Sequence, residues 1–229
     1  ILGVSIYKRE REVFELHPGP IFTQVVLADE INRATPKTQS ALLEGMAEGQ
    51  VTIENKTHAL PDPFFVMATQ NPLDLVGTFP LPDSQLDRFL LSFSIGYPDP
   101  VAERDLLEAE DRAKILDRTT QMLTPDEIRA LREDCDAIHV SGSLLDYVQA
   151  LLAETRDERW FEAGLSPRAG LALLAASRAH AFLEGRDFVA PEDVKAIFPA
   201  LTRHRLSPSG FSQDPENQVR ELLDQVPIP

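Results

Sequence analysis

The stretch Val25-Val26-Leu27-Ala28-Asp29-Glu30 decides the fold that this sequence predicts. Its apolar run is typical of a buried strand, and Asp29 and Glu30 follow at the point where that strand ends. The carboxyl ends of the strands in an open α/β sheet form the edge at which ligands bind. At such an edge one carboxylate can hold Mg²⁺ while its neighbour acts on a water molecule.

A second strand, predicted over residues 64–69, places an amide beside these acids. Its apolar run ends at Gln70-Asn71-Pro72, and parallel strands present their carboxyl ends at the same edge of a sheet. We therefore expect Asn71 near Asp29 and Glu30, where its amide can orient a water molecule. The alternative is structural, because an acidic pair can simply end a strand at the surface and Asn often caps a turn before proline.

Two arginines stand apart from these strand ends. Arg88 directly precedes a third strand, predicted over residues 89–95. The alternative to a functional role for Arg88 is a structural one, in which it forms a surface salt bridge with Asp87. Arg168 lies in the first turn of a helix that Ser166-Pro167 opens. A cation at this end opposes the helix dipole, so its position indicates an anionic partner rather than a contribution to helix stability.

The order of predicted elements indicates an α/β part followed by an all-α part. Strands alternate with helices up to about residue 97, which predicts a parallel sheet with crossover helices over residues 1–97. Helices alone follow over residues 98–229. Residues 1–23 are expected to hold the end of a helix and a hairpin near residues 7–22, and residues 51–60 a second hairpin. The C-terminal tail is rich in Pro, Ser and Gln and is expected to be loose, with one short helix near residues 219–223.

Composition narrows the possible classes of protein. The 229 residues include 43% apolar ones, enough for a core, and no run long enough to span a membrane. The chain starts at Ile1 rather than Met, so we expect it to be a piece of a longer protein. The single cysteine, Cys135, excludes an internal disulfide and fits a reducing cytoplasm. The net charge of −15 disfavours a broad nucleic-acid footprint.

In combination and in this order, several segments resemble the MoxR family of AAA+ ATPases. The resemblance runs along nearly the whole chain. It is carried by Leu27-Ala28-Asp29-Glu30-Ile31-Asn32-Arg33-Ala34, Pro36-Lys37-Thr38-Gln39-Ser40-Ala41-Leu42-Leu43-Glu44, Ala68-Thr69-Gln70-Asn71-Pro72, Gly77-Thr78-Phe79-Pro80-Leu81-Pro82, Gln85-Leu86-Asp87-Arg88-Phe89 and Ser166-Pro167-Arg168-Ala169.

The resemblance implies ATP and Mg²⁺ as cofactors and a role for each matching residue. Asp29 is the Walker B aspartate that holds Mg²⁺, and Glu30 polarises the attacking water. Asn71 is sensor 1, Arg88 is the arginine finger that reaches the nucleotide of a neighbouring subunit, and Arg168 is sensor 2 in the helical lid. A finger supplied in trans explains why such enzymes form homo-oligomeric rings, because neither subunit alone completes a site.

The resemblance also implies a chaperone-like remodeller that acts in the assembly or maturation of protein complexes. Both hairpins face the central pore in such rings and are expected to touch a protein client, and partners with von Willebrand factor A domains are expected. One alternative is a nucleic-acid motor of the same AAA+ clade, which the acidic charge disfavours. The other is a non-catalytic scaffold fragment.

One part of the family pattern is missing from these residues. None of the 11 glycines is followed by lysine, so there is no G-x-x-x-x-G-K-[ST] phosphate-binding loop, and we expect the chain alone to bind ATP weakly and to be inactive. The family's strand order, 5-1-4-3-2, leaves a gap where strand 1 belongs. Either another chain fills this gap, or the strands rearrange, or the sequence is a truncation whose helical part carries most of the order.

Overall fold

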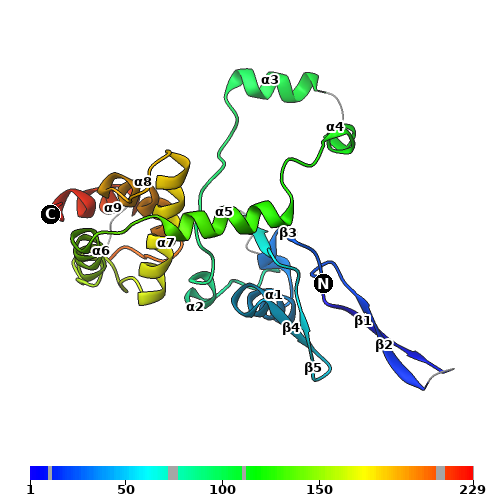
Figure 1. Ribbon diagram of the computed structural model, residues 1–229. Coiled ribbons are helices and arrows are strands. Elements are labelled where there is room, and N and C mark those ends of the chain that lie inside the picture. The colour runs from blue at the N-terminus through cyan, green and yellow to red at the C-terminus, as the bar shows by residue number, and fades with distance from the viewer. Residues whose placement is uncertain (10–11, 72–76, 110–111, 210–214, 229) are drawn as a thin grey trace. The chain divides into compact units, whose positions relative to one another are not determined.

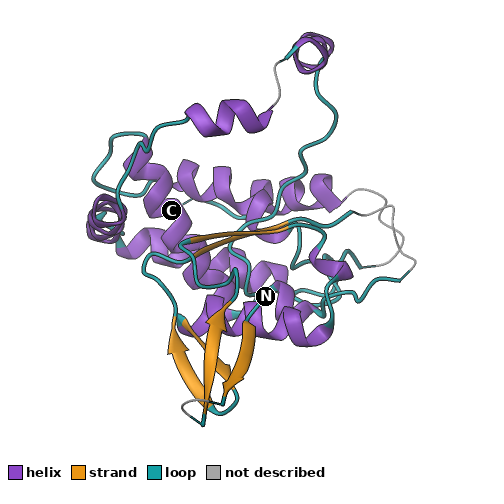
Figure 2. Cartoon of the chain, turned by 90° about the vertical axis from the view of Figure 1, so that its right-hand side faces the viewer, coloured by secondary structure: helices purple, strands orange, loops and turns teal. Residues whose placement is uncertain are grey.

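The computed structural model describes residues 1–229 apart from 10–11, 72–76, 110–111, 210–214 and 229. The chain divides into two compact units, Ile1–Phe89 and Leu90–Pro229. The strands drawn in Figure 2 belong to the first unit, and the helices from α3 onward belong to the second. The fold class, an α/β part with a parallel strand pair followed by a helical lid, is confirmed.

The first unit begins with a two-stranded hairpin. Strands β1 (Gly3–Lys8) and β2 (Val13–Pro18) pair antiparallel and project as a ribbon (Figure 1). Tyr7 and Phe14 face each other across it with their ring centroids 5.1 Å apart. The hairpin is confirmed, but the helix end expected before it is wrong, since the first strand already starts at Gly3.

The second hairpin is also confirmed. Strands β4 (Gln50–Ile53) and β5 (Lys56–Ala59) pair antiparallel. The connecting residues Glu54 and Asn55 have φ of 49° and 65°, which is the left-handed conformation that a tight hairpin turn requires.

Helix α1 (Pro36–Glu48) has the ends that the sequence predicts. Thr35 accepts a hydrogen bond from the Thr38 amide at 3.4 Å, and Gly49 ends the helix with φ of 62°. The apolar face of α1 packs into the core of the first unit, whose buried members are Ile21, Val26, Ile31, Leu42, Leu43, Val51, Leu60 and Leu81.

Strands β3 (Val25–Ala28) and β6 (Phe65–Ala68) form a parallel pair, with Val25 beside Phe65 and Ala28 beside Ala68. One face of the pair packs on the core, but the other face is open. The exposed fractions of its large side chains are 55, 63, 54 and 47% for Val25, Leu27, Phe65 and Met67. The prediction of fully buried strands is therefore wrong for this face, because nothing in the described part of the first unit covers it.

The third strand expected over residues 89–95 does not form. Phe93 and Ile95 are 75 and 89% exposed, and the Ser92 amide donates instead to the carbonyl of Ala200 in the second unit, at 2.8 Å. A strand needs a neighbour for its backbone groups. The strand that the family order places between this segment and β6 is not among the described strands.

The second unit is a helical bundle preceded by two peripheral helices. The peripheral helices are α3 (Pro100–Glu108), which has no buried residue, and α4 (Arg112–Arg118). The bundle comprises α5 (Pro125–Ala137), α6 (Gly142–Thr155), α7 (Pro167–Leu183), α8 (Pro191–Thr202) and α9 (Pro215–Gln225). None of the helices in the described ranges combines the length and apolar composition needed to cross a bilayer.

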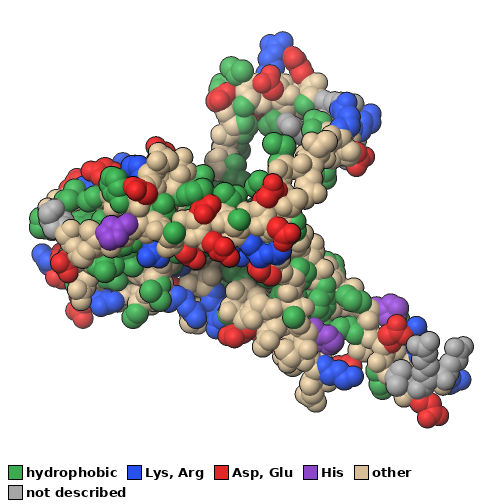
Figure 3. Space-filling view, in the orientation of Figure 1, with side chains coloured by type: hydrophobic (Ala, Val, Ile, Leu, Met, Phe, Trp, Pro, Cys, Tyr) green, Lys and Arg blue, Asp and Glu red, His purple; other side chains and the backbone are tan. Residues whose placement is uncertain are grey.

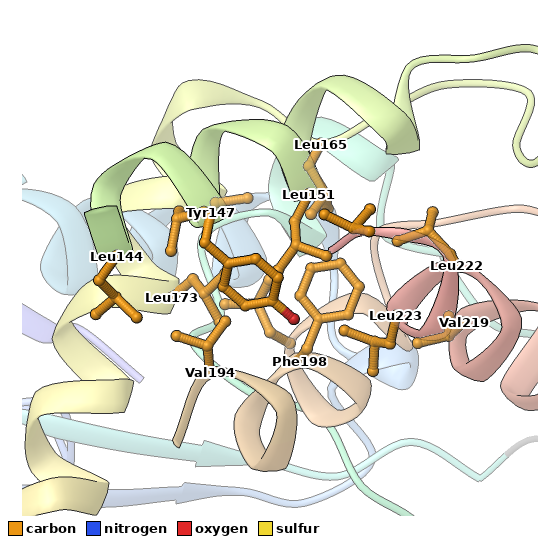
Figure 4. Close-up of a cluster of buried hydrophobic side chains, with 14 of the residues drawn as sticks. Leu144, Tyr147, Leu151, Leu165, Leu173, Val194, Phe198, Val219, Leu222 and Leu223 are labelled. Carbon is orange, nitrogen blue, oxygen red and sulfur yellow. The ribbon is translucent and has the colours of Figure 1, made fainter. Parts of the chain in front are cut away.

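Side chains from α6, α7, α8 and α9 interdigitate in the core of this unit, with Tyr147 and Phe198 among its largest members (Figure 4). Helix α9 contributes Val219, Leu222 and Leu223, all buried. The short helix expected near residues 219–223 is part of α9. The expectation that this tail is loose is wrong for residues 215–226, because an amphipathic helix with an apolar stripe of this kind gains stability by docking.

A buried carboxylate fixes the start of α8. Asp193 has no exposed surface, and its oxygens accept hydrogen bonds from Arg186 Nη1 and Nη2 at 2.6 and 2.5 Å and from the Ala190 amide at 2.8 Å. The Nδ1 atom of His180 lies 2.6 Å from the same carboxylate. Burial alone would raise the pKa of Asp193, but the hydrogen bonds outweigh it and lower this pKa from 3.8 to about 2.

We predict that Asp193 makes the second unit sensitive to acid. Because its folded pKa is lowered, its contribution of about 2 kcal/mol is present above pH 4 and is lost as the pH falls towards 2. Urea unfolding followed by fluorescence of Trp160, the single tryptophan, reports on this unit. Asp193→Asn should lower the unfolding free energy at pH 6 and converge with wild type near pH 2. Asp146→Asn, at an exposed position of α6, is the control, and an equal loss in both variants would contradict the assignment.

Candidate functional site

The turn after β3 carries the two predicted acids. Asp29 is exposed and Glu30 is partly exposed, and a single 3₁₀ turn, η1 (Ile31–Arg33), follows them. Glu30 adopts φ of 48° and ψ of 53°, the left-handed region that residues other than glycine rarely occupy. Such conformations cluster at functional sites, where the surrounding structure compensates for their cost of roughly 1–3 kcal/mol.

Thr69, the residue after β6, holds this turn with four hydrogen bonds. Its amide donates to the Ala28 carbonyl at 3.1 Å, and its carbonyl accepts from the Ile31 amide at 3.0 Å. Its hydroxyl accepts from the Glu30 amide at 2.9 Å and donates to Asp29 Oδ1 at 2.5 Å. Thr69 therefore forms hydrogen bonds with all four consecutive residues 28–31, which we call the acidic turn.

Arg33 orients the Glu30 carboxylate. Its Nε lies 3.0 Å from Glu30 Oε2, and the two side chains are 48% and 38% exposed. A pair this exposed adds little to stability. Its effect is to place the carboxylate on one side of the turn while leaving it accessible.

Asn71 lies close to the acids, as the sequence predicts. It is exposed and follows Thr69 by two residues, so their Cα atoms are at most roughly 7 Å apart. Since Thr69 is bonded to Asp29, Glu30 and Ile31, the ends of β3 and β6 bring the acids and the amide to one edge of the sheet.

Arg88 does not join this group. It lies just after α2 (Asp83–Leu86) and lines a shallow pocket of about 270 Å³ with residues of α1 and α2. The pocket is formed by Ser40, Leu43, Glu44, Glu48, Gln85 and Arg88. Arg88 is exposed, and among the described residues it forms no ion pair, including the one considered with Asp87.

Arg168 belongs to the second unit. Ser166 is the N-cap of α7 and accepts a hydrogen bond from the Ala169 amide at 3.1 Å. Arg168 is exposed in the first turn of this helix, where its charge opposes the dipole.

The acidic edge fits a hard divalent cation that is shared with a phosphate. Among the described residues, no group of three His, Cys, Asp or Glu side chains could enclose a metal. Mg²⁺, however, commonly takes one or two carboxylates and completes its shell with water and phosphate oxygens. Asp29 offers such a ligand, because Thr69 occupies only its Oδ1.

The bonding of Thr69 to the acidic turn was not predicted from the sequence. The residue stands in a quoted motif, but its hydroxyl gave no signal apart from its position at the end of a strand. Only the parallel register, with Ala28 beside Ala68, reveals that Thr69 lies opposite Asp29.

Comparisons with known proteins agree with this fold. The family model described as "ATPase family associated with various cellular activities (AAA)" matches residues 1–91, and the model of the AAA lid domain matches residues 153–226. The crystal structure of a candidate ATPase from Cytophaga hutchinsonii superposes with a TM-score of 0.87 and 32% identity, over all of this chain and 73% of that one. The fold and these matches thus define an AAA+ protein with its lid.

Two curated relatives narrow this class further. YeaC of Bacillus subtilis, itself uncharacterised, is 40% identical over all of this chain and 73% of its own length. The chaperone MoxR1 of Mycobacterium tuberculosis is 38% identical over all of this chain, which spans 64% of MoxR1. The chain belongs to the MoxR family of AAA+ ATPases.

We predict that removing the Thr69 hydroxyl loosens the acidic turn. In Thr69→Val the Glu30 amide loses its acceptor, so its hydrogen exchange should accelerate about five- to tenfold, which corresponds to a net bond of roughly 1 kcal/mol. Thr57→Val is the matched control, since Thr57 is an exposed strand residue of β5. Unchanged exchange at Glu30 in Thr69→Val would show that the backbone bonds alone hold the turn.

Proposed function

We propose that the protein is a MoxR-type ATPase that uses ATP hydrolysis to remodel other proteins during the assembly or maturation of complexes in the cytoplasm. Family membership supports the ATPase class. The observation that carries the proposal is the acidic turn, in which Thr69 holds Asp29 and Glu30 at the carboxyl ends of two parallel strands.

In this proposal each group at the edge has a separate task. Asp29 holds Mg²⁺, which when bound neutralises phosphate charge. Glu30, held by Arg33 and still accessible, polarises the attacking water, and Asn71 orients that water. Phosphoryl transfer depends on such positioning and charge compensation more than on covalent chemistry.

The two arginines would act from elsewhere. Arg88, exposed and distant in sequence from the acidic turn, is proposed as a finger that reaches the nucleotide of the next subunit in a homo-oligomeric ring. Arg168, exposed at the start of α7, is proposed as the lid residue that contacts phosphate. A guanidinium group at each of these positions would compensate charge that develops on the phosphates.

The two hairpins are proposed to contact a protein client. Large apolar side chains are exposed on the first one, with Val4, Ile6, Tyr7 and Phe14 exposing 62, 46, 47 and 64% of their surface. Apolar surface of this kind suits a protein partner. On the face drawn in Figure 3, Lys and Arg side chains are dispersed among acidic ones, which disfavours a nucleic-acid track. A partner with a von Willebrand factor A domain is the expected class.

The nucleotide itself needs a group that these residues do not provide. No glycine is followed by lysine, so neither the amide cradle nor the lysine of a phosphate-binding loop is present. The proposal therefore requires a loop from outside the 229 residues, and it assigns to this chain the hydrolytic acids, the sensors and the finger.

The proposal is tested by Glu30→Gln in the natural full-length protein. The substitution keeps the size of the side chain but removes its ability to polarise water, so nucleotide binding should persist while turnover falls by about 10²–10⁴. Glu133→Gln, at an exposed position of α5, is the control. Unchanged turnover in Glu30→Gln would remove Glu30 from the mechanism.

Arg88→Ala should lower turnover by about 10³–10⁵ if the residue is a finger. Mixed oligomers separate a finger in trans from a residue that acts in its own subunit. Mixing Arg88→Ala with Glu30→Gln subunits restores, at some interfaces, an intact Glu30 facing an intact Arg88, so part of the activity should return. Arg129→Ala, at a partly exposed position of α5, is the control. A mixture as inactive as its components would contradict the trans role.

A further inference from the structure

A buried glutamine on α1 lies directly behind the acidic turn. Gln39 is only 3% exposed, and its side-chain nitrogen donates to two backbone carbonyls, those of Ile31 at 3.0 Å and Phe79 at 2.9 Å. A side-chain amide nitrogen carries two hydrogens. Both donors of Gln39 are therefore used, and both are used on the backbone.

The two carbonyls belong to segments with separate tasks. Ile31 follows Glu30 directly and opens η1. Phe79 lies in the loop that leads to α2 and Arg88, and its amide donates to the Asn32 carbonyl at 2.6 Å. Gln39 thus joins the turn that carries the hydrolytic glutamate to the segment that carries the arginine.

We propose that Gln39 is a positioning residue that sets Glu30 and Arg88 in a fixed register to each other. Because Glu30 and Arg88 act in hydrolysis only under the function proposed above, the role of Gln39 rests on that function. Thr69 holds the acidic turn from the strand side, and Gln39 holds it from the helix side, at the residue next to Glu30.

The geometry requires a glutamine in particular. Glutamate is nearly isosteric but has no donor, and it would turn a negative oxygen towards two carbonyls. Methionine fills a similar volume and leaves both carbonyls without a donor. Asparagine keeps the amide but is one methylene shorter. Without a shift of the backbone, it can reach at most one of the two carbonyls.

The first measurement uses the 229-residue chain and needs no nucleotide. In Gln39→Met, hydrogen exchange at the Phe79 and Arg33 amides should rise at least about tenfold, while exchange in the β4–β5 hairpin stays at the wild-type rate. Gln121→Met is the matched control, because Gln121 also donates to a backbone carbonyl, that of Leu123 at 2.9 Å, but does so in an exposed loop. If Gln39→Met does not fold, Gln39→Asn takes its place with the same expectation.

The second measurement is the turnover of the natural full-length protein. Gln39→Met should lower kcat about 10- to 100-fold with KM changed less than about threefold, and Gln39→Glu should lower kcat at least as much. Wild-type kcat in a folded Gln39→Met, or equal exchange at Phe79 in Gln39→Met and wild type, would overturn the proposal. If wild type lacks ATPase activity, the proposed function fails, and the exchange experiment alone decides whether Gln39 fixes the two segments.

Discussion

Four hydrogen bonds from Thr69 to residues 28–31 hold a glutamate in a left-handed backbone conformation. Each such bond is worth about 1 kcal/mol net, so together they exceed the cost of roughly 1–3 kcal/mol for φ of 48° at Glu30. The acidic turn is therefore an extension of the β3–β6 pairing, although it lies outside both strands. A change in the register of these strands would move both acids with it.

Parallel pairing has a second effect on the same edge. A slip of one residue would turn every side chain of a strand to the opposite face. Asp29 would then face Ala68 or Gln70 in place of the Thr69 hydroxyl, and the core would lose Val26. The core packing of Val26 and the position of the Asp29 carboxylate are thus set by the same register.

Local signals in the sequence predicted most of the elements and the placement of Asp29, Glu30 and Asn71 at one edge of the sheet. Thr35 and Gly49 delimit α1 through their own side-chain and backbone chemistry, and Thr124 starts α5 through a capping box with Glu127. The roles of Thr69 and Gln39 were not predictable from local sequence. Thr69 lies 38 to 41 residues from its partners and Gln39 lies 40 residues from Phe79, so these residues become neighbours only in the fold. The strand predicted over residues 89–95 and the looseness predicted for the tail were wrong for the same reason. Whether either segment is ordered as a strand or a docked helix depends on what packs beside it.

The open face of the β3–β6 pair has a consequence for the behaviour of the chain in solution. Val25, Leu27, Phe65 and Met67 attract any apolar surface, including the same face of another molecule. A net charge of −15 keeps such molecules apart at low ionic strength. Added salt shortens the range of this repulsion to about 3 Å at 1 M while leaving the apolar attraction intact, so colloidal stability falls as the electrolyte concentration rises.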